Sequence, residues 1–238
     1  MILQDFLTSL LGIILGIILT FGVNHLWRRR EENKRTKDML ILVRNELTKD
    51  KELFKFQEEM LKKDGFVYEK ILEAKKDLTQ IPVETIKEYL TQVQVIAVSG
   101  LITTAWQILQ NSELIQKMTD KEMVIRLTEC YAWMNSWHDY IEKEYWGIKK
   151  KMLVLDLEDP YLFFDSVLKN SEFVGFYNEF SLDKEDKWEM FLVTDAMIDF
   201  TISLLDKHGD YRYNMDEMDK ERDSFIEARI IQNQEEKL

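Results

Sequence analysis

Residues 6–30 read FLTSLLGIILGIILTFGVNHLWRRR, and this stretch decides the architecture of the chain. Its first 22 residues, Phe6–Trp27, contain no Asp, Glu, Lys or Arg. A helix of that length is about 33 Å long, which is enough to cross the hydrocarbon core of a bilayer. The sequence therefore predicts a transmembrane helix over 6–27, with residues 1–5 as a short extracytoplasmic N-terminus.

The charges on either side of this run give its orientation. Asp5 is the only charged residue before it, whereas six basic residues follow it between Arg28 and Lys37. A cleaved signal peptide has the reverse order and a small-residue cleavage site, so we expect an uncleaved anchor; a buried helix of a soluble protein is the main alternative. Because basic residues mark the cytoplasmic side, we expect the N-terminus outside and the rest of the chain in the cytoplasm.

Two groups of residues within the anchor predict what it contacts. Trp27, Arg28, Arg29 and Arg30 are expected at the membrane interface, where indole rings and basic side chains favour headgroup depth. Small or polar residues recur every fourth position and form one stripe of the helix: Thr8, Gly12, Gly16, Thr20 and Asn24. Such a stripe lets helices pack closely in lipid, so we expect a homo-oligomer, although glycine is also common in membrane helices generally. The number of copies stays open.

Composition limits the classes of partner. The chain has 32 basic and 44 acidic residues, a net charge of −12. Residues 1–37 carry six basic and three acidic groups, so the remaining 201 residues carry 26 and 41, a net charge of −15. That charge repels phosphate, so we expect no nucleic-acid partner. The partners predicted are the lipid bilayer, further copies of the chain, and a protein partner or small signalling ligand.

Helix formers dominate the chain and only two prolines interrupt it, which predicts an all-α fold. We expect a transmembrane helix that continues into a cytoplasmic helical bundle. The expected divisions are a juxtamembrane basic segment and long helix over 28–63, a helical bundle over 66–209, and a C-terminal helix and polar tail over 210–238. Leu40, Val43, Leu47, Phe54 and Leu61 form a stripe on the long helix, but Asp50 and Gln57 fall at the skipped positions. That pattern favours a helix packed on its own domain over a free coiled coil.

Glycine, proline and helix-capping residues predict the ends of several helices. Gly65 is expected to end the long helix, and the pair Thr119 and Glu122 to form a capping box for a helix that runs to about Met152. Asp159 and Pro160 are expected to open another helix. Further helices are expected over about 66–78, 82–99, 101–111, 161–169, 172–180, 183–208 and 215–232.

Residues with catalytic or metal-binding chemistry are sparse. We find no phosphate-binding loop and no nucleophile elbow, and we name no catalytic, cofactor-binding or metal-binding residue. The single cysteine, Cys130, is expected to be a buried, inert thiol. The aromatic residues Trp106, Tyr131, Trp133, Trp137, Tyr140, Tyr145 and Trp146 are expected in the core, with a ligand pocket as the alternative. A second group would form a partner-binding surface if exposed: Phe163, Phe164, Phe173, Phe176 and Tyr177.

Several motifs resemble those of a diffuse group of bacterial single-pass membrane proteins to which no activity is assigned. They are Asn24-His-Leu-Trp27-Arg-Arg-Arg30, Leu40-x-x-Val43-x-x-Glu46-Leu47, Thr104-Ala-Trp106-x-x-Leu109-x-x-Ser112-x-Leu114, Asp120-Lys-Glu122 and Leu127-x-x-Cys130-Tyr131. The resemblance covers about the first 140 residues and does not reach residues 150–238. It implies an inner (plasma) membrane location in a bacterium, and it transfers no catalytic residue.

These observations favour a non-enzymatic, membrane-anchored helical protein that self-associates and presents a cytoplasmic binding or signalling domain. A bacterial stress or phage-defence effector fits this layout by architecture alone. One alternative is an oligomeric pore that perturbs the membrane. A second is a carboxylate-dependent hydrolase that uses Asp195, Asp199 and Asp206, of which the first two share a helix face.

Overall fold

The computed structural model describes residues 2–75, 77–95, 100–118, 120–155, 158–180, 185–207 and 215–235. Within these ranges it describes no side chain for residues 2–14, 17, 176, 177, 179, 180, 185–188, 215, 216, 234 and 235. Every regular element in the described ranges is a helix, which confirms the all-α class. The chain divides into two compact units, and helix α1 (Ile2–Glu73) contributes residues to both.

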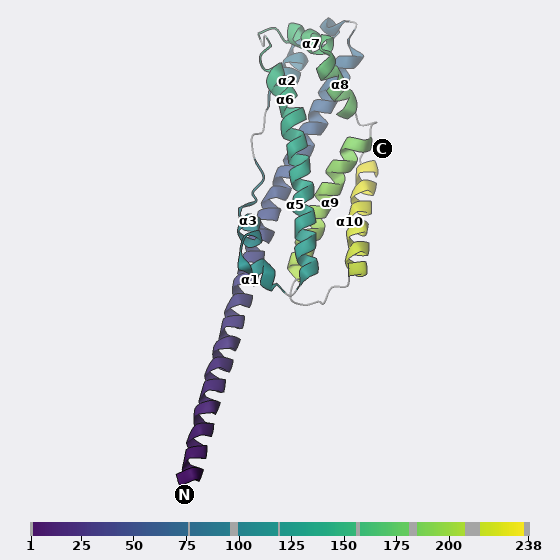
Figure 1. Cartoon of the computed structure of the whole chain (residues 1–238). Coiled ribbons are helices and arrows are strands. Elements are labelled where there is room, and N and C mark those ends of the chain that lie inside the picture. Colours follow the sequence, from purple (N-terminus) through teal and green to yellow (C-terminus); the bar gives the residue numbers. More distant parts are fainter. Residues whose placement is uncertain are drawn as a thin grey trace. The chain divides into compact units, whose positions relative to one another are not determined.

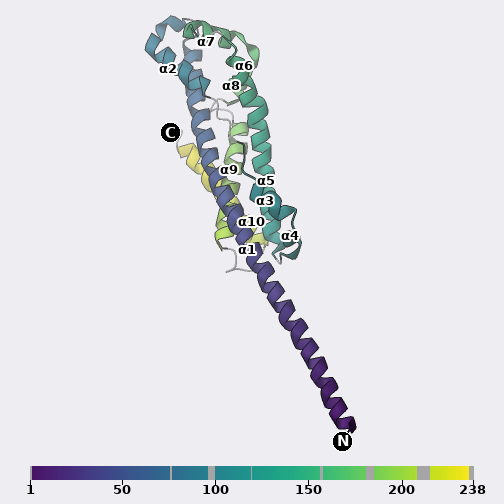
Figure 2. The same ribbon diagram turned by 90° about the vertical axis from the view of Figure 1, so that its left-hand side faces the viewer.

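Unit 1 comprises Met1–Val43, which includes the first part of α1, together with Thr104–Thr119. The second segment forms two short helices beside α1, α3 (Thr104–Gln110) and α4 (Glu113–Lys117) (Figure 2). Trp106 and Leu109 of α3 are buried. The Lys117 ammonium of α4 lies 2.9 Å from the Glu32 carboxylate of α1, which ties the two helices together.

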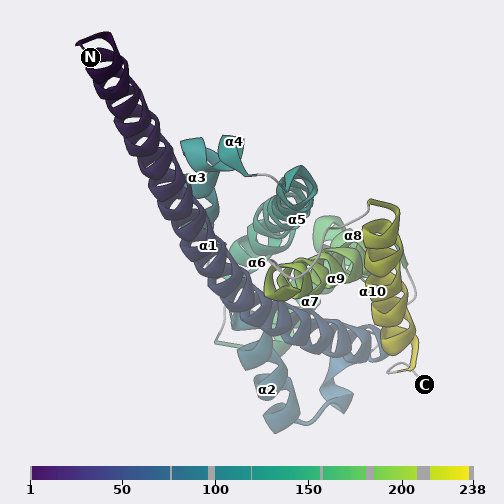
Figure 3. The same cartoon turned by 90° about the horizontal axis from the view of Figure 1, so that it is seen from below.

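Unit 2 comprises Arg44–Thr103 and Asp120–Leu238. Its long helices are the second part of α1, α5 (Lys121–Tyr140), α9 (Glu185–Lys207) and α10 (Met215–Glu235). Helix α9 lies between α5 and α10 and packs against both (Figures 1 and 3). Its buried face, which includes Phe191 and Phe200, supplies much of the core.

Shorter elements lie at the end of unit 2 where α1 terminates (Figures 1 and 2). They are a 3-10 turn η1 (Leu78–Gln80), α2 (Val83–Gln94), α7 (Pro160–Lys169) and α8 (Ser171–Phe180). The Tyr161 hydroxyl of α7 donates a 2.8 Å hydrogen bond to the Ile81 carbonyl before α2. Asp159 caps α7 and Pro160 occupies its first turn, as the sequence predicts.

The helical run that begins with α5 continues beyond Tyr140. It passes into a π-helical segment η2 (Ile141–Tyr145) and then into α6 (Trp146–Met152), so the run ends at Met152 as predicted. The π segment itself is not predicted by the sequence pattern. A π segment holds an extra residue in its turn and is common at functional sites.

Helix α2 ends at Gln94 and not near residue 99 as predicted, and two further predicted helix boundaries are wrong. Gly65 does not end the long helix, because α1 continues to Glu73. Tyr68 and Ile71 beyond the glycine are buried, and their packing outweighs the roughly 1 kcal/mol that a helical glycine costs relative to alanine. Helix α1 therefore runs across the boundary predicted between 28–63 and 66–209.

The second correction concerns the start of α5. The N-cap is Asp120, whose carboxylate accepts a 2.9 Å hydrogen bond from the Met123 amide. Thr119 lies outside the described residues. An aspartate satisfies a free helix amide as well as a threonine does and also interacts favourably with the helix dipole, so the neighbour of the expected cap takes the role.

Candidate functional site: the buried polar row of helix α1

Polar side chains, rather than apolar ones, line part of the buried face of α1 in unit 2. Glu46, Asp50, Gln57 and Asp64 are each at most 5% exposed, and we call them the buried polar row. The last three are spaced seven residues apart, which is two turns of an α-helix, so they recur on one face. Leu47, Phe54 and Leu61 are also spaced by seven and form the apolar row beside them.

Three members of the row accept hydrogen bonds from other parts of unit 2. The Glu46 carboxylate accepts one of 2.7 Å from the Tyr131 hydroxyl of α5. The Gln57 carbonyl accepts one of 3.0 Å from the Trp137 indole N–H. One oxygen of Asp50 accepts a 2.9 Å bond from the Ile102 amide, which precedes α3. These bonds offset the cost of burying polar groups and fix the register of α1 against α5.

The fourth member, Asp64, forms a buried ion pair. Its Oδ2 contacts the Lys149 ammonium of α6 and accepts a hydrogen bond from the Tyr145 hydroxyl. Both charged side chains are 1% exposed. The ammonium also donates to the Val95 carbonyl at 3.0 Å and lies 5.0 Å from the centre of the Tyr145 ring. A buried pair of this kind costs desolvation energy that its attraction only partly returns.

The π segment η2 places the partners of Asp64 on the buried face. Ile141 and Tyr145 are buried and Glu144 between them is exposed. Ile141 and Tyr145 are four residues apart, a spacing that also shares one face in an ordinary α-helix. The extra residue in the π turn rotates the residues after it by about 100° relative to an uninterrupted α-helix, and this sets the direction in which Lys149 points.

Burial shifts the pKa values of these groups in the direction of their neutral forms. Loss of solvent raises the pKa of Asp50 to about 7, with a smaller rise from the nearby Glu46 carboxylate and an opposing effect of the Ile102 amide. Burial also raises the pKa of Asp64 and lowers that of Lys149, while each charge partly restores the other. One oxygen each of Asp50 and Asp64 has no hydrogen-bond partner within the described structure. The row can hold protons, but it offers no exposed nucleophile.

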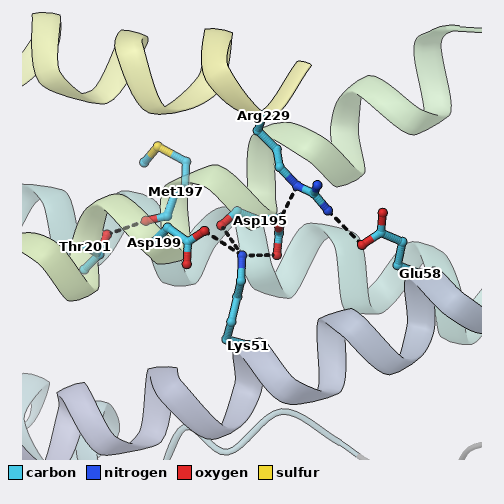
Figure 4. A network of polar contacts seen from close by, with 7 residues as sticks. All are labelled: Lys51, Glu58, Asp195, Met197, Asp199, Thr201 and Arg229. Carbon is cyan, nitrogen blue, oxygen red and sulfur yellow. Dashed lines mark hydrogen bonds and ion pairs between the residues drawn. The ribbon is translucent and has the colours of Figure 1, made fainter. Parts of the chain in front are cut away.

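A second set of charges joins α1 to α9 and α10, beside the buried row (Figure 4). The Lys51 ammonium contacts Asp195 at 2.6 Å and Asp199 at 2.7 Å. The Arg229 guanidinium contacts the other oxygen of Asp195 at 2.8 Å and Glu58 at 2.7 Å. Asp195, whose side chain is 3% exposed, therefore lies between two cations, as Figure 4 shows.

The spacing of these pairs gives the direction of packing. Arg44, Lys51 and Glu58 are seven residues apart on α1. Arg44 contacts Asp206 at 2.8 Å, while Lys51 contacts residues earlier in α9, so the two helices are antiparallel. Charges at such flanking positions set the orientation and register of paired helices. A structural role accounts for the whole set.

Each of the three aspartates considered for a hydrolase forms an ion pair with a basic side chain. Asp195 and Asp199 share Lys51, and Asp206 forms its pair with Arg44 and is half-exposed. The structure brings the first two together and leaves Asp206 apart from them. In the described part of the chain, no group of three or more His, Cys, Asp and Glu side chains is arranged to hold a metal ion.

The cysteine and the first aromatic group lie where the sequence suggests. Cys130 is fully buried, and burial raises the pKa of its thiol to about 12. Trp106, Tyr131, Trp137, Tyr145 and Trp146 are buried in their units, whereas Trp133 is 40% exposed. Most of the group is therefore core, and Tyr131, Trp137 and Tyr145 have the further role of donating to the buried polar row.

The predicted partner surface is corrected in part. Phe163, Phe164 and Phe173 are at most 2% exposed, so these three rings are core residues. Phe163 and Phe164 pack edge to face, with ring centres 5.0 Å apart. The side chains of Phe176 and Tyr177 lie outside the described residues. The apolar character of α7 and α8 serves burial here, as is usual for clustered phenylalanine.

The residues expected to contact the membrane lie on the first part of α1. Gly16, Thr20 and Asn24 are exposed, and the side chains of Thr8 and Gly12 lie outside the described set. The Thr20 hydroxyl donates a 2.7 Å bond to the Gly16 carbonyl of its own helix. Trp27 is 71% exposed, and Arg28, Arg29 and Arg30 are exposed as well. Among the described residues, no helix combines the length and the apolar character that a membrane span requires.

Compared with protein-family models, with curated proteins and with solved structures, the chain matches none. Function must therefore be argued from the chain's own residues. Sequence reasoning missed the buried polar row as a site, although Asp50 and Gln57 stand out as interruptions of the apolar stripe. The seven-residue spacing of Asp50, Gln57 and Asp64 is the signal that could have identified it.

Proposed function

We propose that this chain is a non-enzymatic, membrane-anchored helical protein, oriented with its N-terminus outside and its helical domain in the cytoplasm of a bacterium. It self-associates through its anchor and presents unit 2 to a protein partner or a small signal. A role as a stress or phage-defence effector is consistent with this layout.

One observation carries the proposal, namely the exposed apolar side chains of α1 before its basic residues. Leu15, Ile18, Leu19, Phe21, Val23 and Leu26 are 56–72% exposed. Successive residues of a helix point about 100° apart, so these side chains cover a little more than half of the helix circumference, and the stripe of Gly16, Thr20 and Asn24 lies on the side that they leave. A large side chain of this type gains about 1.5–3 kcal/mol on full burial, and lipid provides such an environment on all sides.

The buried polar row supports a signalling role over a purely structural one. Proteins that retain buried ionic groups use them best for register and switching, because an apolar replacement is often at least as stable. In this chain the row lies on the same helix as the proposed anchor. The pKa of Asp50 is raised to about 7 by burial, so the charge that this row holds would respond to pH, which an apolar stripe would not do.

Among the described residues, the aspartates considered for a hydrolase and the single thiol already have structural surroundings that account for them. Asp195, Asp199 and Asp206 are engaged by Lys51 and Arg44, and the Cys130 thiol is buried. The carboxylate-dependent hydrolase and the membrane-perturbing pore stay predictions of the sequence. A pore would require several anchors side by side, which is a stronger form of the self-association proposed here.

Self-association is tested by Gly16→Leu in the full chain in detergent or nanodiscs, with the mass of the assembly as the measurement. The side chain of leucine would separate two helices that meet at the stripe, so the oligomer is expected to dissociate. Gly22→Leu is the matched control, since Gly22 lies on another side of the same helix and a Cβ atom added at either glycine would meet no atom within 4 Å. Equal masses for both variants and the parent chain would refute assembly through the stripe.

A further inference from the structure

The described basic residues after the anchor divide into two groups. Arg28 and Arg35 form ion pairs with Glu32 and Glu31 one turn away. Arg29, Arg30, Lys34 and Lys37 are exposed, and within the described residues no acidic group pairs with them. Arg29 points about 100° away from Arg30 around the helix, whereas Arg30, Lys34 and Lys37 share one side. We call these three the basic face.

The basic face is opposite the side of α1 that packs in unit 1. Arg30, Lys34 and Lys37 are spaced by four and three residues, so they follow one side of the helix. Glu32 lies on the other side, where it contacts Lys117 of α4 at 2.9 Å, and the buried Leu40 lies about a quarter turn from the basic face. The tertiary contact of Lys117 thus engages an acid that would otherwise weaken the positive potential near the anchor, and it leaves the three cations facing outwards.

Two exposed apolar residues extend the same side. Trp27 precedes Arg30 by three residues and is 71% exposed, and Ile41 follows Lys37 by four and is 48% exposed. Because α1 is continuous here, Lys37 lies about 15 Å along the axis from Trp27. Side chains on a helix lean towards its N-terminus, which in this chain is the direction of the anchor. Long basic side chains can therefore reach back towards the headgroup layer, with Arg30 about one turn from Trp27, Lys34 about two and Lys37 nearly three.

We propose that the basic face is a binding site for anionic phospholipid headgroups. This inference rests on the proposed membrane anchor and adds the class of lipid that the anchor selects. Phosphate oxygens pair well with guanidinium and ammonium groups, and an anionic leaflet attracts such residues with about 1 kcal/mol for each cation. Bound headgroups along one side of α1 would also fix the angle at which the helix is turned about its own axis.

The experiment reconstitutes the full chain in nanodiscs of phosphatidylcholine mixed with phosphatidylglycerol. The ratio of the two lipids that remain bound after release is measured by native mass spectrometry, at low and at high salt. The parent chain should retain phosphatidylglycerol in excess of its share of the bilayer, and salt should reduce the excess. Neutralising the face with Arg30→Gln, Lys34→Gln and Lys37→Gln should lower the preference roughly fivefold for each cation removed.

A matched control removes the same charge elsewhere. Lys143→Gln, Lys151→Gln and Lys169→Gln change three exposed lysines of unit 2 that each pair with an acid. This variant should keep the lipid preference of the parent chain. Retained preference in the basic-face variant, or none in the parent chain, would overturn the inference. Resistance to alkaline carbonate extraction is measured in parallel, because a chain that fails to insert refutes the proposed anchor, whereas an inserted chain without lipid preference refutes only the headgroup site.

Discussion

From Leu15 to Trp27, the large apolar side chains of α1 that the structure describes are exposed, whereas from Glu46 to Asp64 the same helix buries acidic and amide side chains. Hydropathy alone would assign these two regions the reverse environments. The first region has no apolar partner among the described residues of its unit, and the second has specific donors on α5 and α6. The comparison shows that a polar side chain can be buried where a donor pairs with it. An apolar surface without a partner in its own unit would instead be stabilised by an apolar environment.

The strongest test of the buried region is the removal of one half of its ion pair. Lys149→Ala leaves the Asp64 carboxylate buried without its cation, so the free energy of unfolding should fall by about 3–5 kcal/mol. The measurement is chemical denaturation of the full chain in detergent, followed by the tryptophan fluorescence.

The control for this prediction replaces both partners with apolar residues. Asp64→Leu combined with Lys149→Met removes both charges, and its stability should equal or exceed that of the parent chain. A double variant as unstable as Lys149→Ala would show that the pair contributes net stability, and the buried row would then be a structural feature only.

The pH dependence of stability tests Asp50. Its pKa of about 7 in the folded state lies above its ordinary value of 3.8, so the folded protein binds the proton more tightly than the unfolded chain does. The stability from this group is present below about pH 4 and is lost as the pH rises to about 7. Asp50→Asn should remove that loss, so the variant gains on the parent chain by up to about 1 kcal/mol for each pH unit in this window.

Denaturation of both proteins across this pH range provides the measurement for Asp50. Other carboxylates titrate equally in the two proteins, so only the difference between the curves is informative. A difference that does not change with pH would mean that the Asp50 carboxyl group titrates normally and that burial does not govern its charge.

The smallest expected effect concerns Gly65, which lies between two buried residues of α1, Asp64 and Tyr68. No atom lies within 4 Å of the position that an alanine methyl group would take. Gly65→Ala should therefore stabilise the chain by about 0.5–1 kcal/mol, because it reduces the freedom of the unfolded backbone. Gly65→Pro should instead destabilise it, by about 3 kcal/mol or more. Thermal unfolding followed by circular dichroism distinguishes the two, and a loss of stability in the alanine variant would indicate that α1 breaks near Gly65.

The fold was largely accessible from the sequence, and the site was not. Asp159, Pro160 and the apolar periodicity predict most helices, because caps and amphipathic spacing act over one or two turns. The continuation of α1 past Gly65 depends instead on packing of Tyr68 and Ile71, which local signals do not report. The sequence shows that polar residues interrupt the apolar stripe of α1. It does not show that Lys149, 85 positions after Asp64, pairs with it, because that contact depends on the tertiary fold.

The π turn at Ile141–Tyr145 sets the direction in which every later side chain of this helical run points. One surplus residue offsets everything after it by about 100° relative to everything before it. Loss of one residue from the turn would remove both the surplus residue and the offset that it causes, so the regular α-helix that results would still direct Lys149 towards Asp64. Single-residue deletions should therefore be tolerated better in this turn than elsewhere in α5 or α6, where each would rotate every later side chain by about 100°.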